Sequence, residues 1–205
     1  MGRYALLKIK RLISLSLVFI FIFALASCGE AEIKDFDLFE AAEKIIADNG
    51  IVPGGSRYST TDAYPALDDD LIRAYFGDAA DIPDFSKIES YEVYIDETKP
   101  TTPCEFGIFK LSDETYGDTL IEYFKARITE KLANAKMYPS VQTEGLKTAK
   151  FTVVGKYVWY CAVKGGNENI DGYLKGLTSD KFADANEMRD NRRFAPRDKS
   201  GFAER

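Results

Sequence analysis

The sequence predicts an α+β domain: a four-stranded, mostly antiparallel sheet in a ββαββα order, packed against one long helix. Helices are expected before the sheet, and a disordered C-terminal tail after it. Three observations predict this class. Apolar and polar residues alternate with period two from Ile88 onward, a long amphipathic stripe follows, and the two-residue turn Gly155-Lys156 joins two apolar runs. The 205 residues suffice for one such domain with a hydrophobic core.

Residues 1–27 have the organisation of a signal peptide. Four cations precede an uncharged run of 15 residues, Leu12–Ala26, which is shorter than the ~20 residues of a stable membrane span. Small residues then lead into a cysteine in Leu25-Ala26-Ser27-Cys28, which resembles the lipobox of bacterial lipoproteins. The resemblance implies that a diacylglycerol group is attached to the Cys28 thiol before cleavage in front of it, with palmitate as a typical acyl chain.

The alternatives to a lipobox are an uncleaved N-terminal membrane helix and an ordinary secretory signal. Small residues before Cys28 favour the lipobox over the first, and the cysteine itself favours it over the second. All three place the rest of the chain outside the cytoplasm. We therefore expect a lipid-anchored protein on the extracytoplasmic face of a bacterial cell membrane.

The chain after the signal peptide is acidic. Its 178 residues, Cys28–Arg205, carry a formal charge of −10, against −6 for the whole chain. This acidity argues against nucleic acid as a partner, because phosphates favour a basic face, and against attachment to anionic lipid by charge. Membrane affinity must then come from the lipid anchor, with residues 28–36 as a tether.

Two short helices are predicted before the sheet. The first spans the apolar positions 38–46 and is capped by Asp37. A loop rich in Gly and Pro, Ile51–Ala66, follows it. The second helix contains Leu71–Phe76. The three acids Asp68–Asp70 are expected to cap this helix and to interact with its dipole rather than to bind a metal ion.

The central part of the chain predicts two strands and the long helix. Positions 91–95 alternate between the two faces of a strand, and Glu105–Leu111 form the next strand. An apolar stripe with helical spacing then runs through Glu114–Lys136, and Pro139 follows its end. This stripe predicts a helix that faces the core.

A hairpin and a last helix complete the domain. The hairpin joins strands near Ala149–Val154 and Tyr157–Val163, and its Gly-Lys turn is of the II′ kind. Apolar spacing over Ile170–Leu177 predicts the helix. We expect one α+β domain over residues 37–177 and a flexible tail over residues 178–205, where the apolar stripe is lost.

Both faces of the hairpin are apolar, and one long helix covers only one of them. We expect it to cover the face of Phe151, Val153, Val158 and Tyr160. Either the two N-terminal helices cover the other face, or they leave it partly open. If it is open, Tyr157 and Trp159 form a binding surface suited to sugar rings or a partner chain.

The two cysteines after Cys28 are Cys104 and Cys161. Outside the cell they could form a disulfide, and the alternative, which we favour, is two small buried thiols in adjacent strands. The spacing of the strands does not decide between these alternatives.

Enzymatic chemistry has few candidates in this chain. It contains no histidine, so no Ser-His-Asp or Cys-His set and no histidine-ligated zinc site can form. Nucleotide-binding glycine motifs and a Ser-x-x-Lys motif are absent from the sequence as well. We identify no catalytic residue and expect no metal or cofactor. The favoured function is a non-catalytic module that binds an envelope polymer or a protein partner, and the alternative is a carboxylate-dependent hydrolase of envelope polymers.

Part of the chain resembles a family of small bacterial lipoproteins, the domain-of-unknown-function 4358 family. The resemblance is carried by Glu105-Phe106-Gly107-Ile108-Phe109-Lys110, by the long helix ending at Tyr138-Pro139, and by Val154-Gly155-Lys156-Tyr157-Val158. It covers about Leu71–Leu177. It implies a compact α+β domain tethered to a membrane, and it implies no substrate and no catalytic residue.

Overall fold

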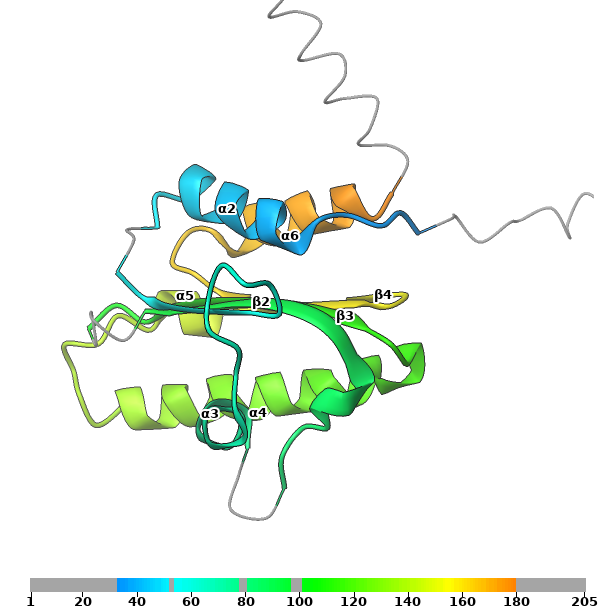
Figure 1. The fold of residues 1–205 in the computed structure, drawn as a ribbon. Coiled ribbons are helices and arrows are strands. Elements are labelled where there is room, and N and C mark those ends of the chain that lie inside the picture. The colour runs from blue at the N-terminus through cyan, green and yellow to red at the C-terminus, as the bar shows by residue number, and fades with distance from the viewer. Residues whose placement is uncertain (1–32, 52–53, 78–80, 97–100, 180–205) are drawn as a thin grey trace, which may run out of the picture. The chain divides into compact units, whose positions relative to one another are not determined.

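The computed structural model describes residues 33–51, 54–77, 81–96 and 101–179. Within them the chain forms a five-stranded antiparallel sheet with the strand order β1-β2-β3-β5-β4 (Figure 1). The strands are β1 Ser56–Ser59, β2 Ile88–Asp96, β3 Cys104–Leu111, β4 Lys150–Val154 and β5 Tyr157–Ala162. The predicted α+β class and the antiparallel pairing of the sheet are confirmed.

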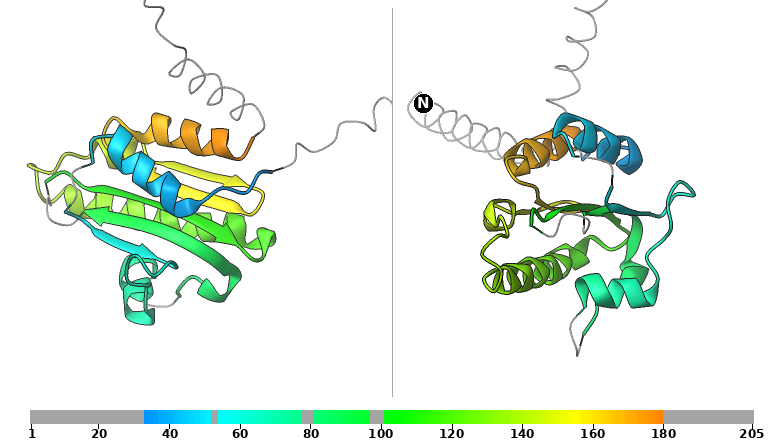
Figure 2. Two further views of the ribbon diagram at one scale, coloured as in Figure 1. Left: turned by 45° about the horizontal axis from the view of Figure 1, so that its top comes forward. Right: turned by 90° about the vertical axis from the view of Figure 1, so that its left-hand side faces the viewer.

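Helices cover both faces of the sheet (Figures 1 and 2). One face is covered by α2 and α6, which span Leu38–Asp48 and Asn167–Leu177. The other is covered by α3 and by the long helix α4, which span Asp69–Phe76 and Gly117–Ala135. The short elements are η1 Phe85–Lys87, η2 Glu114–Tyr116 and α5 Glu144–Lys147.

The expected sheet of four strands lacked β1, which lies inside the segment predicted as a loop. Its residues pair with β2 from Ser56 opposite Ile95 to Ser59 opposite Glu92. The sequence Ser-Arg-Tyr-Ser has no apolar alternation, and Gly and Pro flank it, so no local signal indicates a strand. This edge strand depends on tertiary pairing rather than on propensity.

The predicted faces of the hairpin are confirmed. Val158 and Tyr160 lie in the core beneath α4, with Phe151 and Val153 at its border. Tyr157 and Trp159 lie in the second core, beneath α2 and α6, and each is 0% exposed. The proposed binding surface of Tyr157 and Trp159 is therefore wrong, because helices cover this face of the sheet.

The two helices that cover Trp159 are not the pair expected. We expected both N-terminal helices on this face, and only α2 lies there, whereas α3 packs beside α4 with Ile72 and Phe76 in the other core. The second covering helix is α6. An amphipathic stripe shows that a helix has a buried side, but it does not show which face of a sheet receives that side.

The predicted helix starts agree with the structure. The Asp37 carboxylate accepts a hydrogen bond from the amide of Glu40 (3.0 Å), and that of Asp68 accepts one from the amide of Leu71 (2.8 Å). The first turn of the predicted long helix is a separate 3₁₀ turn, η2, and α4 follows it directly. Gly155 has a φ of 53°, as the first residue of its two-residue turn requires.

One buried polar atom in the core beneath α4 is unsatisfied. The hydroxyl of Tyr160 has no hydrogen-bond partner among the described residues, and burial raises its pKa well above the ordinary value. Arg127 is close enough to oppose this pKa shift but does not reach hydrogen-bond geometry with the hydroxyl. A buried hydroxyl without a partner destabilises the folded state.

Replacing Tyr160 with phenylalanine is accordingly expected to raise the free energy of unfolding by about 1 kcal/mol. Tyr91→Phe is the matched control, because the Tyr91 hydroxyl accepts a hydrogen bond from the amide of Leu67 (2.7 Å). It should lower the free energy of unfolding by about the same amount. Urea unfolding followed by the fluorescence of Trp159 measures both, and equal destabilisation by the two substitutions would contradict the assignment.

Candidate functional site

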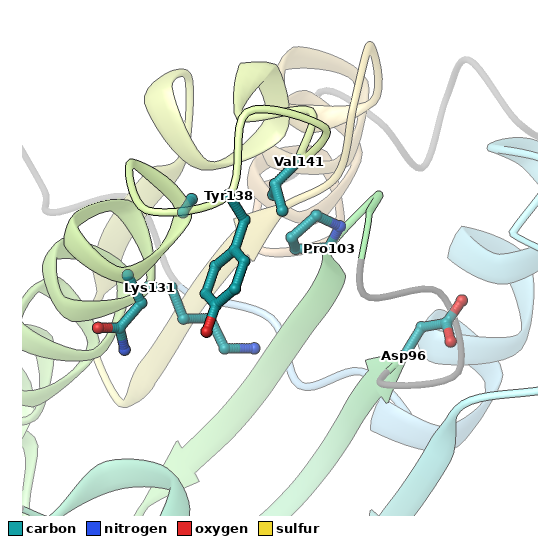
Figure 3. Close-up of a pocket in the computed structure, with 7 residues that line it drawn as sticks. Asp96, Pro103, Lys131, Tyr138 and Val141 are labelled. Atoms are coloured by element: carbon teal, nitrogen blue, oxygen red, sulfur yellow. The ribbon is translucent and has the colours of Figure 1, made fainter.

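A pocket of about 320 Å³ lies at the C-terminal end of α4 (Figure 3). The end of β2, the β2–β3 connection, α4 and the loop after it contribute its lining: Asp96, Pro103, Lys131, Asn134, Ala135, Tyr138 and Val141. In Figure 3 the Tyr138 ring extends toward Lys131, and Asp96 lies across the opening. Its volume is at the lower end of the range for small-ligand sites, so it would fit a small molecule or one side chain of a partner.

The local sequence explains how these residues come together. Asp96 is the last residue of β2 and Pro103 directly precedes β3, so both lie at the same end of the sheet. The chain after α4 turns back on itself, with the amide of Val141 bonded to the carbonyl of Tyr138 (3.0 Å). The amide of Gln142 then donates to the carbonyl of Thr101 (2.7 Å), which holds this loop against the β2–β3 connection.

A buried ion cluster lies beside the pocket. The carboxylate of Glu105 on β3 is 0% exposed and receives two hydrogen bonds from Arg127, from Nε to Oε1 (2.9 Å) and from Nη2 to Oε2 (2.8 Å). Lys131, which lines the pocket, donates to the same Oε2. Arg127 also donates from Nη1 to the carbonyl of Tyr75 (2.7 Å). The cluster therefore joins β3, α4 and α3.

The charges of this cluster determine the protonation state of Glu105 and therefore its possible chemical role. Burial would raise the pKa of Glu105, but the charges of Arg127 and Lys131 outweigh that effect and hold it below its ordinary value. Glu105 therefore stays ionised at neutral pH and cannot serve as a general acid there. Lys131 lines the pocket, but its ammonium is paired with the carboxylate of Glu105. The positive charge that it presents to the pocket is therefore partly neutralised.

An exposed aromatic side chain stands on the rim of the pocket. Tyr138 lines the pocket and is 61% exposed, whereas the neighbouring Met137 is 66% exposed and does not line it. An aromatic side chain exposed beside a concave site is a common anchor for a ligand or a partner chain. Because of this rim, we regard the pocket at the end of α4 as the candidate binding site.

A second pocket, of about 450 Å³, lies between α2 and β1. Arg57 in its wall is bonded to Glu43 and Glu92 and is stacked on the ring of Tyr64, 4.0 Å from the guanidinium. The amide of Gly55 donates to the hydroxyl of Tyr94 (3.2 Å). These groups satisfy one another, so this pocket is best explained by the attachment of β1 to the domain.

Glu92 is a buried acid whose pKa is raised, which is the direction expected of a general acid. Burial raises its pKa, although a hydrogen bond from Ser59 and the charge of Arg57 oppose the shift. However, Glu92 is 1% exposed and does not line the second pocket. Its carboxylate is enclosed by Ser59 and Arg57, so the geometry offers no access for a substrate.

The other residues singled out in the sequence fall into two groups. Cys28 and residues 180–205 of the expected tail lie outside the described residues. Cys104 and Cys161 are both thiols, and the sulfur of Cys161 donates to the carbonyl of Asn167 (3.6 Å). Burial raises the pKa of Cys161 to about 12, so it is unreactive as a nucleophile.

The described residues contain no group of three or more His, Cys, Asp or Glu side chains that could hold a metal ion. In the same part of the chain no helix is long and apolar enough to cross a membrane, and the run Leu12–Ala26 is outside it.

The residues around the candidate site were not predicted, although the sequence contains a signal for two of them. Glu105 shares a face of β3 with the buried Phe109, and Arg127 falls on the stripe of α4 with Leu120 and Phe124. Opposite charges at two inward positions indicate a buried ion pair. Asp96 and Tyr138 carry no such signal, because only the fold brings them together.

Comparisons with known proteins add no relative. No protein-family model, no curated protein and no solved structure matches this chain. The resemblance to the domain-of-unknown-function 4358 family stays a prediction based on the residues quoted for it.

Proposed function

We propose that this chain is a lipid-anchored protein of the extracytoplasmic face of the cell membrane, whose domain is a non-catalytic binding module of the cell envelope. The observation that carries the anchor is Leu25-Ala26-Ser27-Cys28 behind a basic and then an apolar segment. Lipid on Cys28 supplies the membrane affinity that an acidic domain does not obtain from charge.

The binding role is supported by the pocket at the end of α4. It combines an exposed aromatic ring, Tyr138, with polar groups from Asp96, Lys131 and Asn134 in a concave site. Such a combination orients a ligand by polar contacts and holds it by apolar burial. The nearby acid, Glu105, is locked in ion pairs, and this favours a structural over a catalytic use of the cluster.

The binding role predicts a selective loss of binding in a pocket variant. The mature chain is mixed with isolated cell-wall polymers and with stripped membranes, and the bound fraction is measured by co-sedimentation. Tyr138→Ala should weaken binding by roughly tenfold or more, as expected for an aromatic anchor. Met137→Ala is the matched control, since Met137 is equally exposed but does not line the pocket. Equal binding by both variants would contradict the assigned site.

A carboxylate-dependent hydrolase is the second candidate, and the raised pKa of Glu92 is the observation that favours it. The enclosure of this carboxylate by Ser59 and Arg57 counts against it. Incubation with purified peptidoglycan separates the two functions. Reproducible turnover that disappears in Glu92→Gln would support the hydrolase over the binding module.

A further inference from the structure

We propose that residues Ile33–Phe36 clamp the domain in one orientation, with the β4–β5 turn toward the lipid surface and the pocket at the end of α4 away from it. This inference rests on the proposed lipid anchor at Cys28. In this orientation the end of the sheet with Gly155 and Lys156 faces the lipid surface. The pocket faces away from the bilayer, where it is open to ligands outside the membrane.

The clamp is a set of contacts between residues 33–36 and the start of β5. The hydroxyl of Tyr157 donates to Asp35 Oδ1 (2.7 Å) and accepts from the amide of Phe36 (3.3 Å). The ring of Phe36 stacks on that of Tyr157 with 4.5 Å between the centroids. The ammonium of Lys156 lies 2.7 Å from Asp35. These residues were expected to be part of a tether over residues 28–36, and the structure places them against the sheet.

Two further observations show that the clamp is fixed at both ends. The amide of Lys34 is bonded to the carbonyl of Thr178 (3.4 Å), directly after α6. A Cβ placed on Gly155 would collide with Cδ1 of Ile33, so the Ile33 side chain rests on the β4–β5 turn. The bonds from Lys156 and Tyr157 hold the pKa of Asp35 at about 2, so its carboxylate stays ionised at neutral pH.

The length of the chain before the clamp limits the distance to the membrane. Ile33 follows Cys28 by five residues, and five residues span at most ~18 Å in any conformation. With the lipid on Cys28 in the bilayer, the clamp and the β4–β5 turn must lie close to the head groups. A short connection to a fixed clamp restricts rotation, whereas the same connection to a free tether would not.

The pocket lies at the opposite end of the sheet, because Asp96 in its lining pairs with Cys104 at the start of β3, whereas Tyr157 beside the turn pairs with Lys110 near the end of β3. Strand β3 runs from Glu105, opposite Ala162, to Lys110, opposite Tyr157. Helix α4 follows the same axis, because its first residue, Gly117, approaches Val153 in β4, and its end, Ala135, lines the pocket. A helix of 19 residues is ~28 Å long, so the pocket lies at most about that much farther from the lipid surface than the start of α4 does.

The test measures energy transfer from two positions of the lipidated chain to a head-group-labelled lipid. The donor fluorophore is attached to a single cysteine that replaces either Glu114 or Met137. Both residues are exposed; Glu114 is the first residue of η2, and Met137 follows the C-terminal end of α4. The background is Cys104→Ser, and the thiol of Cys161 is buried. The vesicles contain phosphatidylcholine and phosphatidylglycerol. Transfer from Glu114→Cys should exceed that from Met137→Cys several-fold, and equal transfer would overturn the proposal.

The clamp itself is tested in Asp35→Ala combined with Tyr157→Phe. Asp35 has an exposed side chain and Tyr157→Phe keeps the ring, so the domain should fold, which the fluorescence of Trp159 verifies. Energy transfer to the labelled lipid from Glu114→Cys and from Met137→Cys should then become similar. An unchanged difference would overturn the role of the clamp. Flotation of the protein with the vesicles is measured first, because its absence would contradict the lipid anchor and not the orientation.

Discussion

Replacing Arg127 with methionine is expected to lower the free energy of unfolding by about 3–5 kcal/mol. The substitution leaves the carboxylate of Glu105, which is 0% exposed, with only Lys131 as a charged partner, and it removes the donor to the carbonyl of Tyr75. The loss is a large fraction of the 5–15 kcal/mol typical of a domain. Urea unfolding followed by the fluorescence of Trp159 measures it.

Two further variants distinguish a buried ion pair from a general effect of losing a cation on α4. Lys125→Met removes a cation that is paired with Glu122 on the surface, and it should change stability by less than about 0.5 kcal/mol. Glu105→Leu combined with Arg127→Met removes both buried charges, and it should recover much of the loss. If Arg127→Met is no more destabilising than Lys125→Met, the ion cluster is not a structural centre.

Trp159→Ala is expected to lower the free energy of unfolding by a similar amount, about 3–5 kcal/mol. Trp159 is completely buried beneath α2 and α6, and its indole nitrogen donates to Asp171 Oδ1 (3.1 Å). Trp159→Phe, which keeps an aromatic ring, should cost clearly less. Circular dichroism follows these unfolding transitions, because Trp159 is the single tryptophan of the chain. A nearly neutral effect of Trp159→Ala would indicate an exposed side chain and contradict the burial.

The regular elements of the domain were predictable because their residues repeat with a clear period. Strands β2, β3, β4 and β5 and helices α2, α3, α4 and α6 each carry an apolar pattern that matches their structure. Strand β1 and helix α5 were missed, because each has only four residues and depends on its neighbours. Local patterns specify elements, whereas the layer that each helix joins depends on the whole chain.

The candidate site was less predictable than the fold for the same reason. Tyr157 and Trp159 were predicted to form a binding surface only if the N-terminal helices left their face of the sheet open. This alternative arose because the apolar pattern leaves two faces to cover and α6 was not assigned to either of them. The pocket at the end of α4 joins residues from distant parts of the sequence, such as Asp96 and Tyr138. Their proximity follows from the pairing of β2 with β3 and from the bond between Gln142 and Thr101.

The mass of the intact protein extracted from membranes tests the central claim, a lipid anchor on Cys28, most directly. We predict a chain that begins at Cys28 and carries the added mass of a diacylglyceryl group, and we predict that Cys28→Ala accumulates as the unprocessed precursor. An unmodified chain that retains residues 1–27, or a Cys28→Ala protein that is cleaved and released like the natural one, would contradict the claim.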